Sequence, residues 1–404
     1  MSQFWLLTAA SSVSKMGNTF LRLAVPLAIL QTTGSPAAAI LSVALENLPY
    51  LAGPVLGTLI DRFPRRTVFA VSELSQAVLV VLVTVALGAH RVDVIYVLLL
   101  LLGFGSVISN ITSEFSLIPS LAPADKVGAA YSRYMTCVDT ARFAGPLLGG
   151  LLISVTSTQV ALLFDAATFV LTAAVVWTLR VGREREPQAE GFVTSLVRGW
   201  RVFLRLPGIP RLTATLALFN LGAGSIATVL LAVGTAEWHW SPSLAGGVIS
   251  AGSIAGAAGA AVTARVGASW TWARRILLWM AASAAFAGLL VVGQPHAAIA
   301  GFVGMSFASG AMNVATMAFR HDAIPTEFTG RVNTVIRSLV MGSIPASALL
   351  LSWTSRSDNH FVMLSPALLF TAAAVVLWAS GRISVRASPA ISPEPVERRE
   401  VVAP

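Results

Sequence analysis

The chain has 404 residues, of which 55% are apolar and only 11% are charged. Soluble domains carry roughly 25% charged residues, so this composition excludes an ordinary soluble protein and predicts one that crosses a membrane. The net charge of +9 does not indicate nucleic-acid binding, because most of the arginines fall in alternate loops, as membrane topology requires.

Twelve apolar segments follow one another along the chain, each near or above the roughly 20 residues that cross a bilayer. We expect helices, because backbone polar groups must be bonded within lipid, and the long continuous apolar runs exclude a barrel. The first segment runs far past the length of a signal peptide, so we expect it to be retained. The predicted spans cover residues 4–32, 37–60, 67–89, 93–117, 127–154, 159–180, 212–236, 243–264, 275–294, 297–319, 332–354 and 361–381.

The distribution of arginine and lysine predicts the orientation of these spans. The loops that we place on the inner side hold twenty arginine and lysine residues, whereas the loops that we place on the outer side hold only Arg91 and Arg356. We therefore expect both termini in the cytoplasm of a multi-pass protein of the bacterial cytoplasmic membrane.

The chain also repeats itself. Arg65-Arg66 recurs as Arg274-Arg275, and Ile118-Pro119-Ser120 recurs as Ile324-Pro325-Thr326, at offsets of 209 and 206 residues. Two halves of six spans explain both offsets. The sequence therefore predicts an all-α membrane protein with 12 transmembrane helices in two pseudo-symmetric six-helix bundles.

These two bundles are expected at residues 1–180 and 212–381. The segment 181–211 is expected to be a cytoplasmic linker, because from Phe192 onward apolar residues alternate with arginines in the pattern of an amphipathic helix. The tail 382–404 is rich in proline and charge, and we expect it to be disordered.

The loop between the second and third spans places an acid among three arginines. The positive-inside rule explains the arginines but not the acid, so we expect a cytoplasmic gate that is held closed only while the protein opens outward. Asp61 would also suit the positive end of a helix near residue 330. The predicted gate residues are Gly57, Asp61, Arg62, Arg65, Arg66, Glu73, Glu114 and Arg133.

The letters of this loop, Gly57-Thr-Leu-Ile-Asp61-Arg62-Phe-Pro64-Arg65-Arg66, resemble the signature loop of the major facilitator superfamily (MFS), with proline where many members have glycine. The fifth span carries Gly145-Pro146-Leu-Leu-Gly149-Gly150, which resembles the G-P-x-x-G-G signature of MFS exporters and predicts a helix bend at these residues. The alternative is an ordinary packing face of small residues.

Three shorter pieces, Leu117–Pro123, Asn47–Pro49 and Gly330–Val332, look like the macrolide-efflux and enterobactin-exporter branch of the MFS. That resemblance implies a proton-coupled exporter of drugs or siderophores. Many proton antiporters carry an arginine early in the fourth span, but residues 94–105 hold none. Arg22, Arg133 or Arg142 could take its place.

Ionisable side chains inside spans are costly and are candidates for function. Arg22 and Glu46 both lie roughly 15 Å from the outer edge, which predicts an ion pair, while Lys15, Asn110 and Asp139 share a deeper level. Two fixed ion pairs that lock helices together are an equally good interpretation. Asp165 is a further acid within a span.

From these depths and from helical spacing we derive two sets of candidates. The proton-coupling candidates are Glu46, Asp139 and Arg142. The substrate-cavity candidates are Lys15, Asn18, Arg22, Asn110, Asn220, Asn313 and Arg337.

The expected function is proton-coupled export of a drug-like or siderophore-like small molecule by alternating access, in a monomer that contacts its substrate, protons and lipid but no nucleic acid. An uptake symporter of the same fold and a non-transporting membrane sensor or assembly partner are the alternatives. Neither Lys15 nor Lys126 is followed by Ser or Thr, so there is no P-loop for ATP. We expect no cofactor, no metal and no enzymatic activity.

Overall fold

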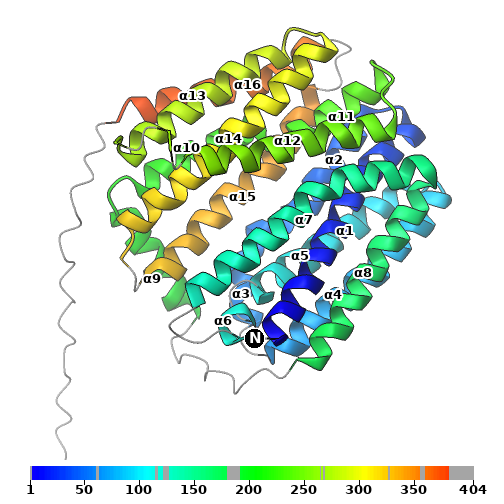
Figure 1. The fold of residues 1–404 in the computed structure, drawn as a ribbon, viewed down its shortest axis with the longest axis horizontal. Helices are drawn as coiled ribbons and strands as arrows, with labels where there is room; N and C mark the ends of the chain where they lie inside the picture. The colour runs from blue at the N-terminus through cyan, green and yellow to red at the C-terminus, as the bar shows by residue number, and fades with distance from the viewer. Residues whose placement is uncertain are drawn as a thin grey trace, which may run out of the picture.

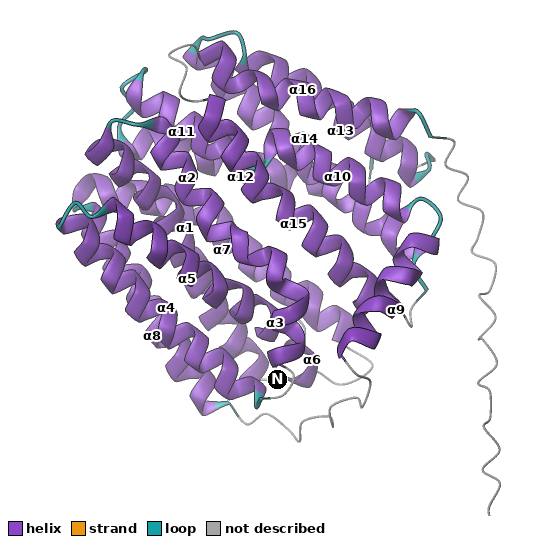
Figure 2. Cartoon of the chain, turned by 180° about the vertical axis from the view of Figure 1, so that it is seen from behind, coloured by secondary structure: helices purple, strands orange, loops and turns teal. Residues whose placement is uncertain are grey.

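The computed structural model describes residues 2–60, 63–113, 117–121, 127–179, 192–263, 265–266, 269–325, 328–354 and 360–381. Within these ranges the chain forms helices and no strands (Figure 2). Figure 1 shows two groups of long helices side by side, the earlier part of the chain in one group and the later part in the other.

The first half of the chain contributes six spans. They are α1 (Ser2–Thr33), the broken span α2–η1–α3 (Pro36–Asn47, Leu48–Ala52 and Gly53–Ile60), α4 (Arg65–Gly88), α5 (Val92–Thr112), α7 (Val127–Val155) and α8 (Thr158–Thr178). The break is a 3-10 segment that contains Pro49, a residue without the N–H that a continuous α-helix would need. A single short turn, α6 (Ile118–Leu121), precedes α7.

The second half contributes another six spans. They are the broken span α10–α11 (Ile209–Ala223 and Ile226–Ala236), α12 (Pro242–Thr263), α13 (Trp272–Leu290), α14 (Pro295–Ala323), α15 (Thr329–Thr354) and α16 (His360–Ala379). These bounds agree with the predicted spans to within a few residues. The fourth span, α5, ends at Thr112, where the sequence predicts an end at residue 117.

Within each half the helices pack in the same pattern. α1 packs on α7 and α8 as α10 packs on α15 and α16, and α4 packs on α5 and α8 as α13 packs on α14 and α16. The contacts between the halves are equally symmetric, since α2 packs on α15 and α12 packs on α7. This repeated pattern confirms the two pseudo-symmetric bundles that the sequence offsets predict.

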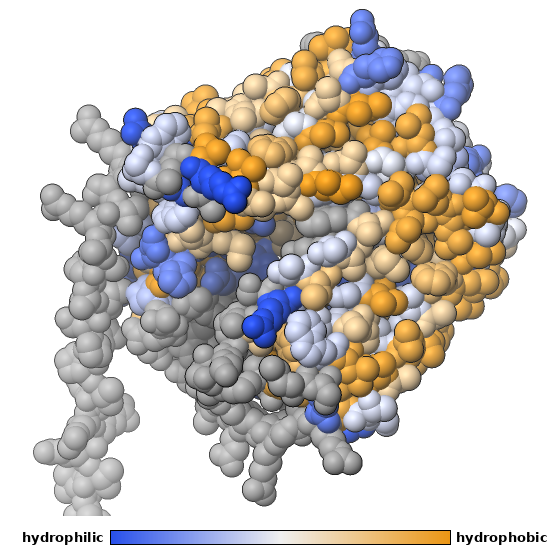
Figure 3. Space-filling view, viewed as in Figure 1, coloured by the Kyte–Doolittle hydropathy of each residue, from blue (hydrophilic) through white to orange (hydrophobic). Residues whose placement is uncertain are grey.

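Nine helices of the described residues are long and apolar enough to cross a membrane, and Pro36–Ala52 and Leu364–Ala379 are shorter apolar helices. In the space-filling view, apolar side chains cover much of the visible side of the bundle, which suits contact with lipid (Figure 3). The first helix, α1, has 32 residues but carries the polar side chains described below.

We call the end of the bundle where α1 ends and α2 begins the far end, and the opposite end, which carries Ser2 and Arg65, the N-terminal end. The two halves contact each other at the far end. At the far end the Ser352 hydroxyl donates to the Ala37 carbonyl at 2.9 Å. Leu30, Ala39 and Ala232 form an apolar cluster there. At the N-terminal end Figure 3 shows a recess between the halves, near α9, with hydrophilic side chains around it.

A further helix, α9 (Phe192–Arg205), follows the first half and packs against α10 and α15. It begins where the sequence predicts an amphipathic helix. Phe203 is buried against the bundle, whereas Trp200 and Leu204 are exposed. The predicted linker residues 181–191 and the tail 382–404 lie outside the described residues.

Candidate functional site

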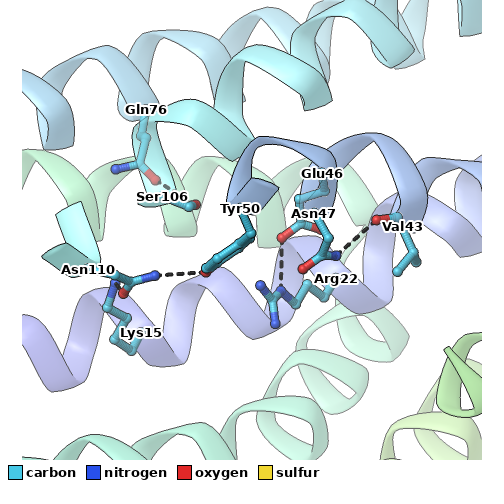
Figure 4. Close-up of polar contacts among 9 residues, drawn as sticks. All are labelled: Lys15, Arg22, Val43, Glu46, Asn47, Tyr50, Gln76, Ser106 and Asn110. Carbon is cyan, nitrogen blue, oxygen red and sulfur yellow. Dashed lines mark hydrogen bonds and ion pairs between the residues drawn. The ribbon is translucent and has the colours of Figure 1, made fainter. Parts of the chain in front are cut away.

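An ion pair joins α1 to α2 inside the first half. The Arg22 Nε donates to Glu46 Oε1 at 2.9 Å, and the side chains are 52% and 11% exposed (Figure 4). This is the pair that matching depth predicts. Each partner neutralises the other in a setting where an isolated charge would be costly.

The exposed part of Arg22 faces a space inside the protein. Its helix, α1, is enclosed by α2, α7, α8 and α11, so a side chain that projects from its middle does not face lipid. Arg22 also lies roughly 16 Å from Thr33, the last residue of the helix, at 1.5 Å per residue. A half-exposed arginine at this depth indicates a solvent-accessible cavity between the two halves.

A chain of hydrogen bonds runs deeper along the same face of the first half. The Lys15 ammonium donates to Asn110 Oδ1 at 2.6 Å, and the Asn110 amide donates to the Tyr50 hydroxyl at 2.9 Å (Figure 4). Lys15 and Asn110 are each 6% exposed. The sequence predicts Lys15 and Asn110 at one depth, but nothing in the sequence pattern distinguishes Tyr50, which η1 turns toward them.

Glu73 has partners other than the predicted ones. We expected it to accept hydrogen bonds from the loop arginines, but its carboxylate accepts from the Ser14 hydroxyl at 3.0 Å and from the Ser109 hydroxyl at 2.6 Å. The side chain is 1% exposed between α1, α4 and α5. In this conformation Glu73 thus lies in the interior of the first half, because α4 turns this residue inward, and its part in the gate stays a prediction.

A close approach of α5 to α2 fixes the position of Glu46. A Cβ on Gly103 would fall on the Glu46 carbonyl oxygen and lie 2.9 Å from Pro49 Cγ. Next to this contact, Ser106 donates to Gln76 Oε1 at 3.0 Å and thereby joins α5 to α4 (Figure 4). Glycine at 103 lets the two backbones meet, so the acid of the ion pair is positioned by the main chain of a neighbouring helix.

The glycines of α7 serve close helix packing. A Cβ on Gly145 would fall on the Thr19 side chain of α1, and one on Gly149 would lie 2.7 Å from the Phe20 ring. Gly150 faces the other half, where a Cβ would lie 2.8 Å from the Pro242 carbonyl oxygen. Pro146 lies inside a helix that continues from Val127 to Val155. In this structure the glycines of the motif allow close helix packing, and the helix bend stays a prediction.

The remaining cavity candidates are dispersed. Asn220 donates to the Val340 carbonyl at 2.9 Å and so ties α10 to α15. Asn18 and Arg337 are half-buried, and Asn313 is exposed on α14. Arg142, a proton-coupling candidate, is half-buried on α7, and the Asp139 side chain lies outside the described residues.

The predicted gate can be followed only in part, because Asp61, Arg62 and Glu114 lie outside the described residues. Arg66 lies over the Trp177 ring with 5.7 Å to its centroid. Gly57 has open space where a Cβ would stand, and Arg133 is exposed. Arg65, at the start of α4, is half-buried.

In the second half, Arg275 of the loop that repeats the Asp61 loop has clear contacts. Arg275 is 5% exposed, lies 4.3 Å from the centroid of the Trp272 ring and donates to the Thr263 carbonyl at 3.4 Å. It thus satisfies a carbonyl at the end of α12. This loop has lost the acid, so its arginine has a structural partner in place of a gate partner.

One buried acid, Asp165, was not distinguished by the sequence from the other acids within spans. Asp165 of α8 is fully buried, and within the described chain neither of its carboxylate oxygens has a hydrogen-bond partner. No group of three His, Cys, Asp or Glu that could hold a metal ion occurs among the described residues.

Comparison with known proteins places the chain among transporters. The profile of the Major Facilitator Superfamily matches residues 7–349. The chain is 27% identical over 356 residues to the uncharacterized MFS-type transporter YfiS of Bacillus subtilis (strain 168), which covers 82% of each protein. It is 26% identical to the multidrug efflux pump Tap of Mycobacterium tuberculosis (strain ATCC 25618 / H37Rv) over 64% of this chain and 65% of that one. The crystal structure of the nucleoside transporter NupG superimposes with a TM-score of 0.73 at 12% identity, covering 94% of this chain and 98% of that chain.

Proposed function

Because the chain belongs to the Major Facilitator Superfamily, and is thus a membrane transporter and not an enzyme, we propose that it exports a small molecule in exchange for protons. The substrate class that we propose is drug-like or siderophore-like, as in the macrolide-efflux and enterobactin-exporter branch. The similarity to a protein named as a multidrug efflux pump supports this choice.

The observation that carries the proposal is the half-exposed Arg22 paired with Glu46 in a space between the two halves. We infer that this space is reachable from the N-terminal end, because the halves contact each other at the far end. We propose that the N-terminal end faces the cytoplasm, in line with the arginine distribution, so that this conformation is the one that admits substrate from inside.

Alternating access then follows from the two halves rocking about the site. In the outward conformation the far-end contacts open, and the loop of Asp61 with its arginines closes the cytoplasmic side. Glu46 takes up a proton outside, which removes its charge and weakens its hold on Arg22 and on a polar substrate bound between them. The proton returns inward with the empty carrier, and its release restores the ion pair.

The described residues favour a substrate with at least one polar or anionic group, because Arg22 and Lys15 line one face of α1 at the site. An uptake symporter would use the same residues with the opposite direction of net flux. A sensor would keep the fold without moving a substrate.

The test uses everted membrane vesicles from bacteria that produce the protein, with a panel of fluorescent efflux dyes added to the medium outside them. Export predicts dye accumulation in these vesicles when their interior is acidified, and loss of accumulation when a protonophore is added. The variant Glu46→Gln should abolish accumulation at an unchanged protein level. Asp93→Asn is the matched control, since Asp93 also pairs with an arginine, Arg91, at 2.7 Å but on the surface.

The other outcomes separate the alternatives. Accumulation only in right-side-out vesicles would establish uptake and overturn export. Wild-type accumulation by Glu46→Gln would remove the ion pair from the coupling mechanism. If no dye moves in either vesicle orientation, and Asp61→Asn leaves the cellular phenotype untouched, the sensor interpretation replaces transport of this substrate class.

A further inference from the structure

Asp165 is the most isolated acid in the described part of the chain. It is fully buried on α8, and neither oxygen of its carboxyl group has a hydrogen-bond partner there. The nearby Thr168 hydroxyl donates at 2.7 Å to the backbone carbonyl of Asp165 and not to its side chain. The backbone of α1 covers the acid at Gly17, where a Cβ would fall on Asp165 Oδ1.

A second buried acid lies within electrostatic range. Glu73 of α4 accepts from the Ser14 hydroxyl of α1, and Gly17, which meets Asp165 Oδ1, lies one turn further along the same helix. Lys15, next to Ser14 in the chain, lies within electrostatic range of Glu73. The helices that contact α8 carry other charged residues. Arg22 is bonded to Glu46, and Arg66 lies over the Trp177 ring. Arg133 is exposed, Arg65 and Arg142 are half-buried, and the Asp139 side chain lies outside the described residues.

The two acids differ in their ability to carry a charge. Glu73 accepts two hydroxyl hydrogen bonds and has Lys15 in range, and each of these favours the carboxylate. Among the described residues Asp165 has no such pair of hydrogen bonds and no lysine in range, and a buried carboxylate so weakly supported is far less favourable than the neutral acid. Two buried acids that act on each other also do not both ionise readily.

We propose that Asp165 and Glu73 form a proton-binding pair sealed inside the first half, in which Asp165 holds the proton in this conformation. The pair lies where α8 packs against α4 and α1, at Ser14 and Gly17. The proposal rests on the proposed function only where it makes this a second exchanged proton beside that of Glu46; proton binding itself does not depend on transport.

Packing alone does not account for these acids. The second half repeats the fold, and there α13 and α16 are the counterparts of α4 and α8. Neither helix contains an acid. Their fully buried polar residues include Ser283 and Thr371. Small hydroxyl side chains therefore suffice to pack this position, which leaves the charge chemistry of Asp165 and Glu73 to be explained.

Lys15, Asn110 and Tyr50 offer a route from the pair to the contact between the halves, electrostatic as far as Lys15 and hydrogen-bonded beyond it. When the Asp165 carboxyl group gives its proton to water, the new carboxylate adds a second negative charge near Lys15. That charge draws the ammonium away from Asn110, which in this conformation is bonded to Tyr50. The next residue, Leu51, fills the space left by Gly342 of α15 in the other half. Loss of the proton thus loosens η1 where it meets the second half.

The first experiment measures the proton directly, in purified full-length protein in lipid nanodiscs. Infrared difference spectra between acidic and alkaline buffers should show a carboxylic-acid C=O band that persists at neutral pH and disappears at alkaline pH. Asp165→Asn should lack this band. Glu73→Gln should move its loss to lower pH, because the negative charge of Glu73 no longer opposes ionisation of Asp165. Asp93→Asn should leave the band unchanged.

The second experiment asks whether the proton moves the halves. In a Cys137→Ser background, cysteines at Ala37 and Ser352 report the far-end contact by cross-linking, since these residues are hydrogen-bonded at 2.9 Å. The cross-linked fraction should change with pH in the parent and stay at its acidic value in Asp165→Asn. A cross-linked fraction that follows pH equally in both would overturn the coupling role.

Folding and function are kept apart by these measurements. Asparagine has the shape of a neutral aspartic acid, so Asp165→Asn should keep the thermal stability of the parent; if it does not fold, the shift in Glu73→Gln still decides. A band that is unaffected by both variants overturns the pair. If the band behaves as expected while vesicles show no proton-driven dye transport, the pair stands and proton-coupled export fails.

Discussion

A close backbone contact between the two halves is made by glycine, and a single methyl group there should shift the conformational equilibrium. Gly246 of α12 lies against α7, so that a Cβ on it would be 2.5 Å from the Pro146 carbonyl oxygen and 3.0 Å from Gly150 Cα. Ordinary contacts between heavy atoms begin near 3.5 Å. The variant Gly246→Ala therefore needs the helices to separate by about 1 Å, because both neighbouring atoms belong to the backbone and cannot move aside as a flexible side chain could.

Overpacking of this kind costs about 1–3 kcal/mol. Since α7 and α12 belong to different halves, the cost falls on the conformation in which the far end is closed and is relieved when the halves part. A change of this size corresponds to roughly a 5- to 150-fold change in the ratio of the two conformations. We expect Gly246→Ala to populate the form that is open at the far end.

The assay is the cross-link between cysteines placed at Ala37 and Ser352, whose yield should fall in Gly246→Ala. Gly247→Ala is the matched control on the same helix, because a Cβ at Gly247 has no heavy atom within 4 Å. An unchanged yield in Gly246→Ala, together with an unchanged melting temperature, would refute the idea that this contact governs closure. A lower melting temperature with an unchanged yield would make the contact structural only.

Two further variants test the framework of the site. Gly103→Ala should lower the stability by about 1–3 kcal/mol in thermal unfolding, because the methyl group meets the Glu46 carbonyl; Gly88→Ala, which has open space, should not. Arg211→Ala should cost about 1.5–3 kcal/mol in chemical unfolding, since this guanidinium donates to the Leu377 carbonyl and to Ser380 and so ties α10 to α16. Arg211→Lys should recover only part of that loss, and full recovery would show that charge alone matters there.

The spans could be predicted because long apolar runs leave the chain few alternatives in a bilayer. The breaks within them could not be placed so well. Pro49 interrupts the second span and Gly224-Ser225 separates α10 from α11, yet both lie in runs that read as continuous. Apolar composition reports that a segment crosses the bilayer and says little about whether its hydrogen bonding is continuous.

The site was predictable to the extent that depth alone decides a contact. Arg22 finds Glu46 because they lie at the same level on neighbouring helices, and Lys15 finds Asn110 for the same reason. Depth does not say how a helix is rotated, and for that reason Glu73 was assigned to the loop arginines when α4 turns it toward α1 and α5. The isolation of Asp165 depends on what its neighbours lack, which no sequence pattern records.

The interruption at residues 48–52 gives the second span a joint. The segment before it, α2, touches α15 and α11 at the far end, and the segment after it, α3, runs to the loop of Asp61. A rigid rod would have to tilt as one piece whenever either end opened. A jointed span can keep one end in place while the other moves, so the far-end contacts and the predicted gate at the Asp61 loop need not be released in the same instant.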